Sequence, residues 1–549
     1  MNDHNGFNLL DEPWIVVLEN NGREQEVSIL QLFDYARHFA AIGGEVPTQA
    51  FAITRLLLAF LHRAIDGPAD QDEWLQLWTS DRLPMDQIRA YADRIRHRFD
   101  LFDPIAPFYQ VANLRSSSGD LTHPRKIVAD MPDPGKDDLP LFTTRTVSSL
   151  SSIKIAEAAR WLVHTHAFDP TGTKTGVVDG GSRYGPSLGW CGQIGGVLPE
   201  GKNLHETLLL NLIARDVETY VRIGAPDDLP PWERDPCGPE WQERPAHGAI
   251  DLYTWQTRRI RLARKGDGVV GVVLANGDKI APQNMHGIEP HCGWRYDEQQ
   301  TKKQHGIPVY VPLKHDPARS VWRGIGALLP STSGRRTNTG AEPKRFLAPG
   351  VLQWISDLVQ QGVLPEGYKT GLHVYGAKYG PGRQTSTWND IIDDNLPVSL
   401  LVLREDHPEA GRAAVEAVAD ADQAASETWK LADNVAQAAG AEPKSGAGES
   451  ARELLYAALE EPYRRWVATL VPGVDIDAAR CRWREVVSES ARQIAAQVVS
   501  AAPPSAWVGR KVSGHLINVS IAETWFNAAI RRLFPPARPN TTTLEVAAP

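Results

Sequence analysis

The feature that most constrains this chain is a change of character near residue 400. From there to Phe534 the sequence shows almost no strand pattern, and mostly alanine-rich helical stretches follow one another over residues 408–439, 449–470, 475–501 and 515–534. Helix-breaking residues separate these stretches, at Gly440, Pro472-Gly473 and Pro503-Pro504. Long helices joined by short loops predict an antiparallel four-helix bundle.

The second of these stretches carries a clear apolar stripe. Its large apolar residues recur at steps of three and four, which places them on one helix face: Tyr456, Leu459, Tyr463, Trp466 and Leu470. We expect this face to lie in the core of the bundle.

The residues before 400 mix helix and strand patterns. Residues 14–18 and 25–29 flank Asn21-Gly22, which predicts an opening hairpin, and residues 253–263 and 269–274 predict a second strand pair. Helices are expected at residues 48–65, 84–99 and 151–163, and long loops at 114–140 and 169–202. The fold class is therefore α+β, with a mixed α/β domain at 1–400, an all-α four-helix bundle at 401–535 and a disordered tail at 536–549.

Composition narrows the class of protein. The formal net charge of -9 excludes a whole-protein basic field that grips DNA unaided, so any nucleic-acid contact must come from local patches or from an assembly. No apolar run is long enough for a membrane span, and the first residues lack a signal-peptide pattern. The four cysteines are far apart, at Cys191, Cys237, Cys292 and Cys481. A cytoplasmic protein without cofactor or metal is expected.

Several residue groups resemble fragments of catalytic sites, and each is incomplete. His164 and His166 with Asp169, and the pair His315-Asp316, have ligand types found in metal-dependent hydrolases, but no full ligand set follows at a convincing spacing. The alternative that they leave open is a metal-dependent nuclease or phosphohydrolase. A helical scaffold protein without a nucleic-acid role is the third hypothesis.

Another incomplete group is His286, His291 and Cys292, which lacks a fourth metal ligand. The glycine-rich segment 172–185 lacks the spacing of a phosphate-binding P-loop, which argues against nucleotide hydrolysis. Its glycines and Lys174 are still suited to approach a nucleic-acid backbone. The basic strand at 258–265 and the pair Lys302-Lys303 are further local positive patches.

An ordered set of short motifs spans most of the chain. The motifs are NLLDEPWIV at 8–16, GEVPTQ at 44–49, PFYQ at 107–110, NLHETLLLN at 203–211 and LEEPYRR at 459–465. In this order they resemble the CasA family, the large subunit of the type I-E CRISPR surveillance complex called Cascade. Cysteine pairs that occur in some family members are missing here, so no metal site is carried over.

The resemblance implies a non-catalytic role in antiviral defence. A subunit of this family inspects DNA for the protospacer-adjacent motif (PAM), helps to open the duplex into an R-loop, holds the displaced strand and recruits a helicase–nuclease. Target sequence is then read by RNA–DNA pairing, while protein reads only the short flanking duplex. The implied partners are crRNA, double-stranded target DNA with its displaced strand, the other Cascade subunits and the helicase–nuclease, with no membrane.

The resemblance also assigns roles to residues. The minor groove of the motif would be contacted by the glycine segment and a lysine, namely Lys174, Gly176, Gly180, Gly181 and Lys279. Lys302 and Lys303 would meet the DNA backbone, and the loop Leu141, Phe142 and Thr143 would anchor the subunit to the crRNA and neighbouring subunits. The turn at 379–385 would be the wedge that opens the duplex, with Arg383 and Gln384 near its tip.

Overall fold

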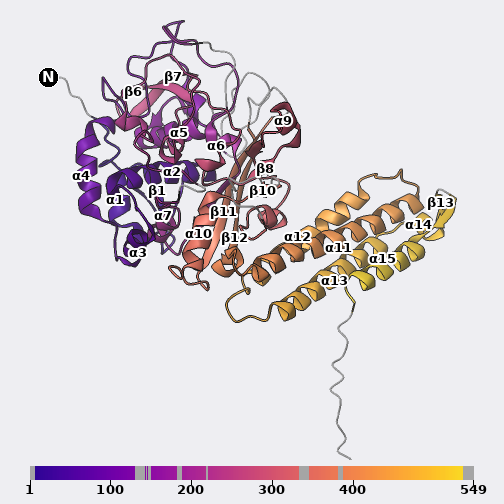
Figure 1. Ribbon diagram of the computed structural model, residues 1–549. Coiled ribbons are helices and arrows are strands. Elements are labelled where there is room, and N and C mark those ends of the chain that lie inside the picture. The colour runs from indigo at the N-terminus through magenta and orange to yellow at the C-terminus, as the bar shows by residue number, and fades with distance from the viewer. Residues whose placement is uncertain are drawn as a thin grey trace, which may run out of the picture. The chain divides into compact units, whose positions relative to one another are not determined.

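The computed structural model describes residues 6–129, 143, 145, 150–181, 188–217, 221–332, 345–380, 388–512 and 514–535. The chain separates into two compact units, residues 1–408 and 409–549, which are described here one at a time (Figure 1). The first unit mixes helices and strands and the second is almost entirely helical. The predicted α+β class is confirmed.

Helix α2 (Pro47–Ile65) forms the centre of the first unit. Its side chains are buried continuously from Thr48 to His62, because the run of Leu, Phe and Ala residues is apolar on every face. One charged residue, Arg55, lies inside this run. Its guanidinium makes a two-pronged ion pair with Glu289, with N–O distances of 2.7 and 2.8 Å, so the buried charge is neutralised.

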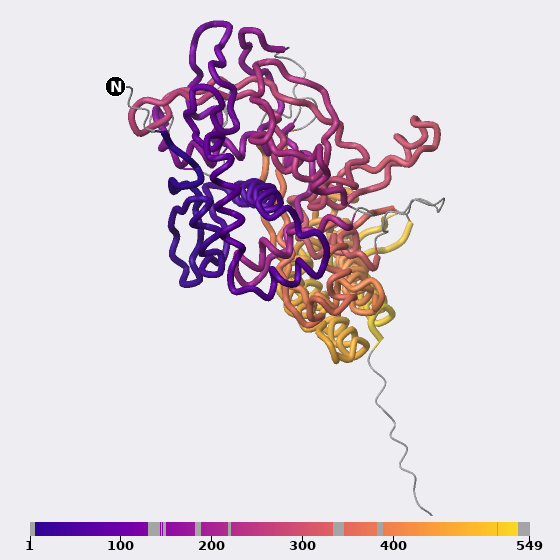
Figure 2. The backbone as a smooth tube through the Cα atoms, turned by 60° about the vertical axis from the view of Figure 1, so that its left-hand side comes forward, coloured from indigo at the N-terminus to yellow at the C-terminus, as the bar shows by residue number. Residues whose placement is uncertain are grey.

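Shorter helices surround α2. They are α1 (Ile29–Asp34), α3 (Gln71–Thr79), α4 (Met85–Ile95), α5 (Ile155–Phe168), α6 (Trp190–Gln193), α7 (Leu204–Leu210), α8 (Ala249–Tyr253), α9 (Glu298–Lys303) and α10 (Gly350–Gln360). Many of them start at a side-chain cap of the expected kind, such as Asn203 before α7 and Asp297 before α9. In the second view the indigo and magenta segments of this unit interleave, so parts far apart in sequence lie side by side (Figure 2).

The described strands of the first unit form four small three-stranded sheets. The opening sheet has the order β2-β1-β3, from β1 (Ile15–Glu19), β2 (Glu24–Val27) and β3 (Phe39–Ile42). A second has the order β4-β7-β6, from β4 (Ile153–Lys154), β6 (Arg258–Lys265) and β7 (Gly268–Asn276). A third has the order β10-β8-β9, from β8 (Trp294–Tyr296), β9 (Tyr310–Pro312) and β10 (Phe346–Leu347).

The fourth sheet, in the order β12-β11-β5, contains the longest strands. It joins β5 (Gly196–Glu200) to the antiparallel hairpin of β11 (Lys369–Tyr379) and β12 (Trp388–Ser399). The sequence pattern did not predict these strands. It predicted a loop over residues 169–202, where the structure has α6 and β5. The many glycines of residues 169–202 favoured a loop. Strand β5 forms nevertheless, because it is buried and its pairing with β11 stabilises it.

The second unit is built on four long helices, α11 (Glu409–Ala439), α12 (Ala447–Val467), α13 (Ile476–Ser500) and α15 (Val519–Leu533). The predicted stripe from Tyr456 to Leu470 is buried, which confirms its place in the core. Tryptophan and tyrosine side chains join the helices through backbone carbonyls: Trp483 Nε1 donates to Ala417 O at 2.8 Å, and Tyr463 Oη donates to Ala414 O at 3.0 Å. The orange-to-yellow helices stay together in both views (Figures 1 and 2).

The second unit also contains a short helix and hairpin that the sequence analysis missed, namely α14 (Pro504–Val508), β13 (Arg510–Val512) and β14 (His515–Ile517). The predicted tail at 536–549 lies outside the described residues. The domain limits at 400 and 535 stay a prediction. Among the described residues, every helix is too short or too polar to cross a bilayer.

Candidate nucleic-acid interface

The glycine segment is fixed to strand β7 through one apolar side chain. Val177 packs in a small cluster with Val273 and Ala275 of β7. Backbone hydrogen bonds hold the flanks, because Thr175 N donates to Leu274 O at 2.9 Å and Val178 N donates to Arg115 O at 3.0 Å. Residues 175–178 of the segment therefore lie along the end of β7 and pack against the protein's own core.

Lys174 lies inside the protein. Its ammonium donates to Asp169 Oδ2 at 2.5 Å, its side chain is only 9% exposed, and Arg258 pairs with the same carboxylate. Burial lowers the pKa of Lys174 to about 8, although Asp169 opposes the shift. Burial alone would raise the pKa of Asp169, but Lys174 and Arg258 outweigh it and hold that pKa below its usual value. In this arrangement Lys174 cannot reach a DNA groove without breaking a buried ion pair, so the structure places it as a support of the segment.

Lys279 and Gly181 meet at one side chain, Trp241. The Lys279 ammonium lies 3.9 Å from the centroid of the Trp241 ring, a cation–π contact. A Cβ atom placed on Gly181 would lie 2.4 Å from Trp241 Nε1, so the loop backbone approaches the indole as closely as a glycine allows. The structure therefore brings together two of the predicted minor-groove elements, which are about a hundred residues apart in sequence.

Two arginines of the basic strand at 258–265 are internal supports. Arg258 pairs with Asp169, and Arg259 NH2 donates to Asp278 Oδ1 at 2.5 Å. Their side chains are 0% and 3% exposed. Neither guanidinium faces solvent, so the expectation that Arg258 and Arg259 belong to a positive surface patch is wrong. The charge of Arg259 fixes Asp278, the residue before Lys279, and the charge of Arg258 fixes Asp169.

Lys302 and Lys303 lie on α9 with exposed side chains. Lys302 Nζ donates to Glu298 Oε1 at 2.6 Å, one helical turn earlier. Such a surface pair is weak and exchanges readily for a phosphate contact. Both lysines are therefore accessible to a nucleic-acid backbone.

The anchor and wedge lie largely outside the described residues. Of the anchor, Thr143 is described and accepts a hydrogen bond from Arg145 N at 3.2 Å, while Leu141 and Phe142 are outside. Of the wedge, Arg383 and Gln384 are outside. The structure does define the flanks: Tyr379 is the last residue of β11 and pairs with Trp388 of β12, so the residues between them connect a hairpin. Tyr379 itself is buried and donates to Phe168 O at 2.6 Å.

Comparison with known proteins identifies the family. The sequence profile described as CRISPR-associated protein Cse1 (CRISPR_cse1) matches residues 8–494. The chain belongs to the Cse1, or CasA, family. The resemblance found in the sequence is thereby confirmed over most of the chain.

Relatives agree with this membership. The crystal structure of Thermobifida fusca Cse1 shares 39% identity with the chain, covers 98% of it and 99% of its own length, and has a TM-score of 0.88. The CasA/Cse1 protein of Thermus thermophilus is 35% identical over 338 residues, which is 60% of this chain and 61% of that protein. A chain of a CRISPR RNA-guided surveillance complex, at 16% identity, covers 96% of this chain and 99% of its own length with a TM-score of 0.71, a likeness of fold.

The histidines that suggested a hydrolase have structural partners in this Cse1-family chain. His164 Nε2 lies 2.9 Å from Thr48 Oγ1, and its ring stacks on Phe168. His166 Nε2 lies 2.9 Å from Tyr109 O. Burial lowers the pKa of His164 to about 3 and that of His166 to about 4, so both rings are neutral near pH 7. They point to different partners and do not form one ligand set.

The other histidine groups are also engaged within the Cse1 fold. His315 Nε2 lies 3.0 Å from Gly196 O, whereas the Asp316 carboxylate accepts from Ala318 N at 3.1 Å. His291 lies between Arg55 and Asn211, at 3.4 and 3.1 Å, and Cys292 contacts the backbone of its neighbour. Within the described ranges, no three His, Cys, Asp or Glu side chains gather closely enough to hold a metal ion.

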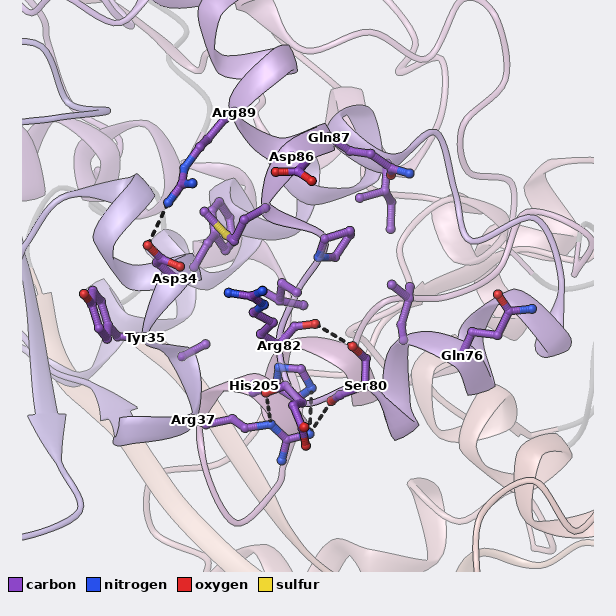
Figure 3. Close-up of a pocket in the computed structure, with 18 of the residues that line it drawn as sticks. Asp34, Tyr35, Arg37, Gln76, Ser80, Arg82, Asp86, Gln87, Arg89 and His205 are labelled. Atoms are coloured by element: carbon purple, nitrogen blue, oxygen red, sulfur yellow. Dashed lines mark hydrogen bonds and ion pairs between the residues drawn. The ribbon is translucent and has the colours of Figure 1, made fainter.

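A hollow of about 1400 Å³ lies among α1, α3, α4 and α7 (Figure 3). Two of its arginines are used by the protein: Arg37 donates to the carbonyls of Ser80 and Asp81, and Arg89 pairs with Asp34 at 2.8 Å. Figure 3 shows these cations turned to their partners at the wall of the hollow. The Gly181–Trp241–Lys279 contact therefore remains the better candidate for recognition in this Cse1-family protein.

Proposed function

We propose that this chain is the non-catalytic large subunit of a crRNA-guided DNA surveillance complex in antiviral defence. It recognises the protospacer-adjacent motif, helps to open the duplex, holds the displaced strand and recruits the helicase–nuclease. Its partners are crRNA, target DNA and the other subunits of the complex, in the cytoplasm. Family membership supports the complex, and the meeting of Gly181 and Lys279 at Trp241 supports the motif-reading role.

The chemistry of this contact suits minor-groove reading. An ammonium group donates to the acceptors that the minor groove presents, and glycines let the backbone approach the groove walls closely. Because A·T and T·A pairs present the same acceptors there, the reader tolerates several motif sequences. The net charge of -9 explains why such a chain depends on a few local contacts and on the rest of the complex.

The remaining sites complete the proposal. Lys302 and Lys303 contact the DNA backbone, the loop with Phe142 docks the subunit, and Gln384 in the β11–β12 connection opens the first base pair. The connection joins β11 and β12, the longest strands of the first unit, and this paired hairpin gives a wedge a rigid base. The chain itself performs no hydrolysis in this account.

The test uses the complex assembled with crRNA and either the natural chain or Lys279→Ala. Binding is measured to duplexes with and without the motif. A hydrogen bond from a charged donor contributes about 1.5 kcal/mol, so Lys279→Ala should lower the affinity for motif duplexes on the order of tenfold. The matched control is Lys369→Ala, which removes an exposed lysine at the start of β11. Equal affinities for Lys279→Ala and the control would refute the role of Lys279.

A further inference from the structure

Trp241 connects the glycine segment to Lys279, and the sequence analysis gave it no role. The Lys279 ammonium lies over the ring at 3.9 Å from its centroid. Gly181 lies against the Nε1 edge of the same indole, where a side chain would collide. One half-buried indole therefore contacts both elements that the proposed function assigns to the motif.

The backbone around Trp241 is held from several directions. The next residue, Gln242, accepts from Lys279 N at 2.8 Å and donates its own N–H to Asp278 Oδ1 at 3.0 Å. On the other side, Arg259 Nε donates to the carbonyls of Gly238 and Glu240 at 3.1 and 3.2 Å. The backbone that carries the indole is thus held in place relative to the backbone of Lys279.

The contact has a consequence for the lysine. A lysine side chain has four rotatable bonds and loses much conformational entropy when a ligand orders it. The negative face of an indole attracts the ammonium electrostatically and limits the positions it samples before DNA arrives. A ligand that meets a preorganised donor binds more tightly than one that must order it.

We propose that Trp241 is a positioning residue for motif recognition: its ring face holds the Lys279 ammonium in place before DNA binds. This inference rests on the proposed function of Lys279. It assigns to Trp241 no contact with DNA. Its effect passes through Lys279, so the two residues must be energetically coupled.

The experiment measures affinity for duplexes with and without the motif, using complexes assembled with crRNA and Trp241→Leu, Trp241→Phe, Lys279→Ala or the double variant Trp241→Leu/Lys279→Ala. Trp241→Leu, which removes the π face, should weaken motif binding about 3- to 10-fold and leave non-motif binding unchanged. Trp241→Phe keeps a ring face and should retain most of the affinity. The double variant should bind no more weakly than Lys279→Ala alone.

The outcomes separate the two claims. If Lys279→Ala leaves motif binding unchanged, the proposed function of this contact fails. If Lys279→Ala weakens it but Trp241→Leu has no effect, or adds its full effect to that of Lys279→Ala, the positioning role of Trp241 fails. Equal loss on motif and non-motif duplexes would assign Trp241 a purely structural role and overturn the proposal. Trp241→Met, whose longer and unbranched side chain also lacks a π face, replaces Trp241→Leu if the latter lowers the amount of subunit in the complex.

Discussion

Replacing Asp169 by asparagine tests how the glycine segment is held. The carboxylate pairs with Lys174 at 2.5 Å and with Arg258, and all three side chains are at most 9% exposed. Asparagine keeps the shape and removes the anion, so two buried cations lose the carboxylate that they share. Breaking a buried pair in this way costs about 3–5 kcal/mol.

The pH dependence of this cost follows from Lys174. Without Asp169 the buried amine of Lys174 is expected to give up its proton. Deprotonating an amine with an ordinary pKa of 10.5 costs about 4–5 kcal/mol of folding free energy at pH 7 but about 2 kcal/mol at pH 9. The destabilisation of Asp169→Asn should therefore shrink as pH rises from 7 to 9. The double variant Asp169→Asn/Lys174→Met should be more stable than Asp169→Asn at pH 7, because no buried amine remains.

The assay is urea unfolding followed by tryptophan fluorescence at pH 7 and pH 9. Asp179→Asn is the matched control, since Asp179 is exposed in the same segment and its φ of 55° suits asparagine. If Asp169→Asn unfolds at the same urea concentration as this control, or shows the same loss at both pH values, the buried ion-pair account of the segment is wrong.

Four further predictions follow from single sites. The His373 ring lies between the carboxylates of Glu200 and Asp393, at 2.7 and 2.5 Å. Burial alone would lower the pKa of His373, but the hydrogen bonds to these carboxylates raise it to about 9. The contribution of His373 to the free energy of unfolding, on the order of 2 kcal/mol, is therefore present below pH 6.5 and lost as pH rises through 9. His373→Gln should flatten that part of a stability–pH curve measured by urea unfolding, and an unchanged curve would contradict the pairing. Lys302→Ala with Lys303→Ala should weaken binding of the complex to all duplexes and reduce the salt slope by about 2, whereas a changed motif preference would contradict a backbone role. Phe142→Ala should impair docking onto the complex by about 1.5–3 kcal/mol, measured by titration of the subunit, and unchanged docking affinity would show the loop is misplaced. Gln384→Ala should slow RNA–DNA hybrid formation on duplex targets more than on targets already mismatched beside the motif, and equal slowing on both would indicate a role in binding.

The sequence predicted elements whose signals are local. The stripe from Tyr456 to Leu470 and the apolar run of α2 predict their helices, because the spacing of apolar residues can be recognised within a few helical turns. The β11–β12 hairpin was not predicted, because β12 contains residues that are rare in strands, namely Asp390, Asp393, Asp394 and Pro397. The stability of β12 comes from its pairing along the whole of β11.

The site was predictable only in part. Resemblance to the family gave the glycine segment and Lys279, and the structure places Gly181 and Lys279 at Trp241. No sequence pattern shows that Lys174 faces inward, because the carboxylate with which it pairs is shared with Arg258, 84 positions further along the chain. The sequence offers one indication of a role for Trp241. It lies in a polar, proline-rich connection, where an indole is expected to find a contact partner.

The most direct test of the central claim compares complexes assembled with crRNA in the presence and absence of this chain. Affinity is measured for two matched duplexes that carry the same target and differ only in the flanking motif. The complete complex should prefer the motif duplex, and omission of the chain should abolish that preference while RNA–DNA pairing to single-stranded target is retained. A motif preference that survives without the chain would contradict its role as the motif-reading subunit.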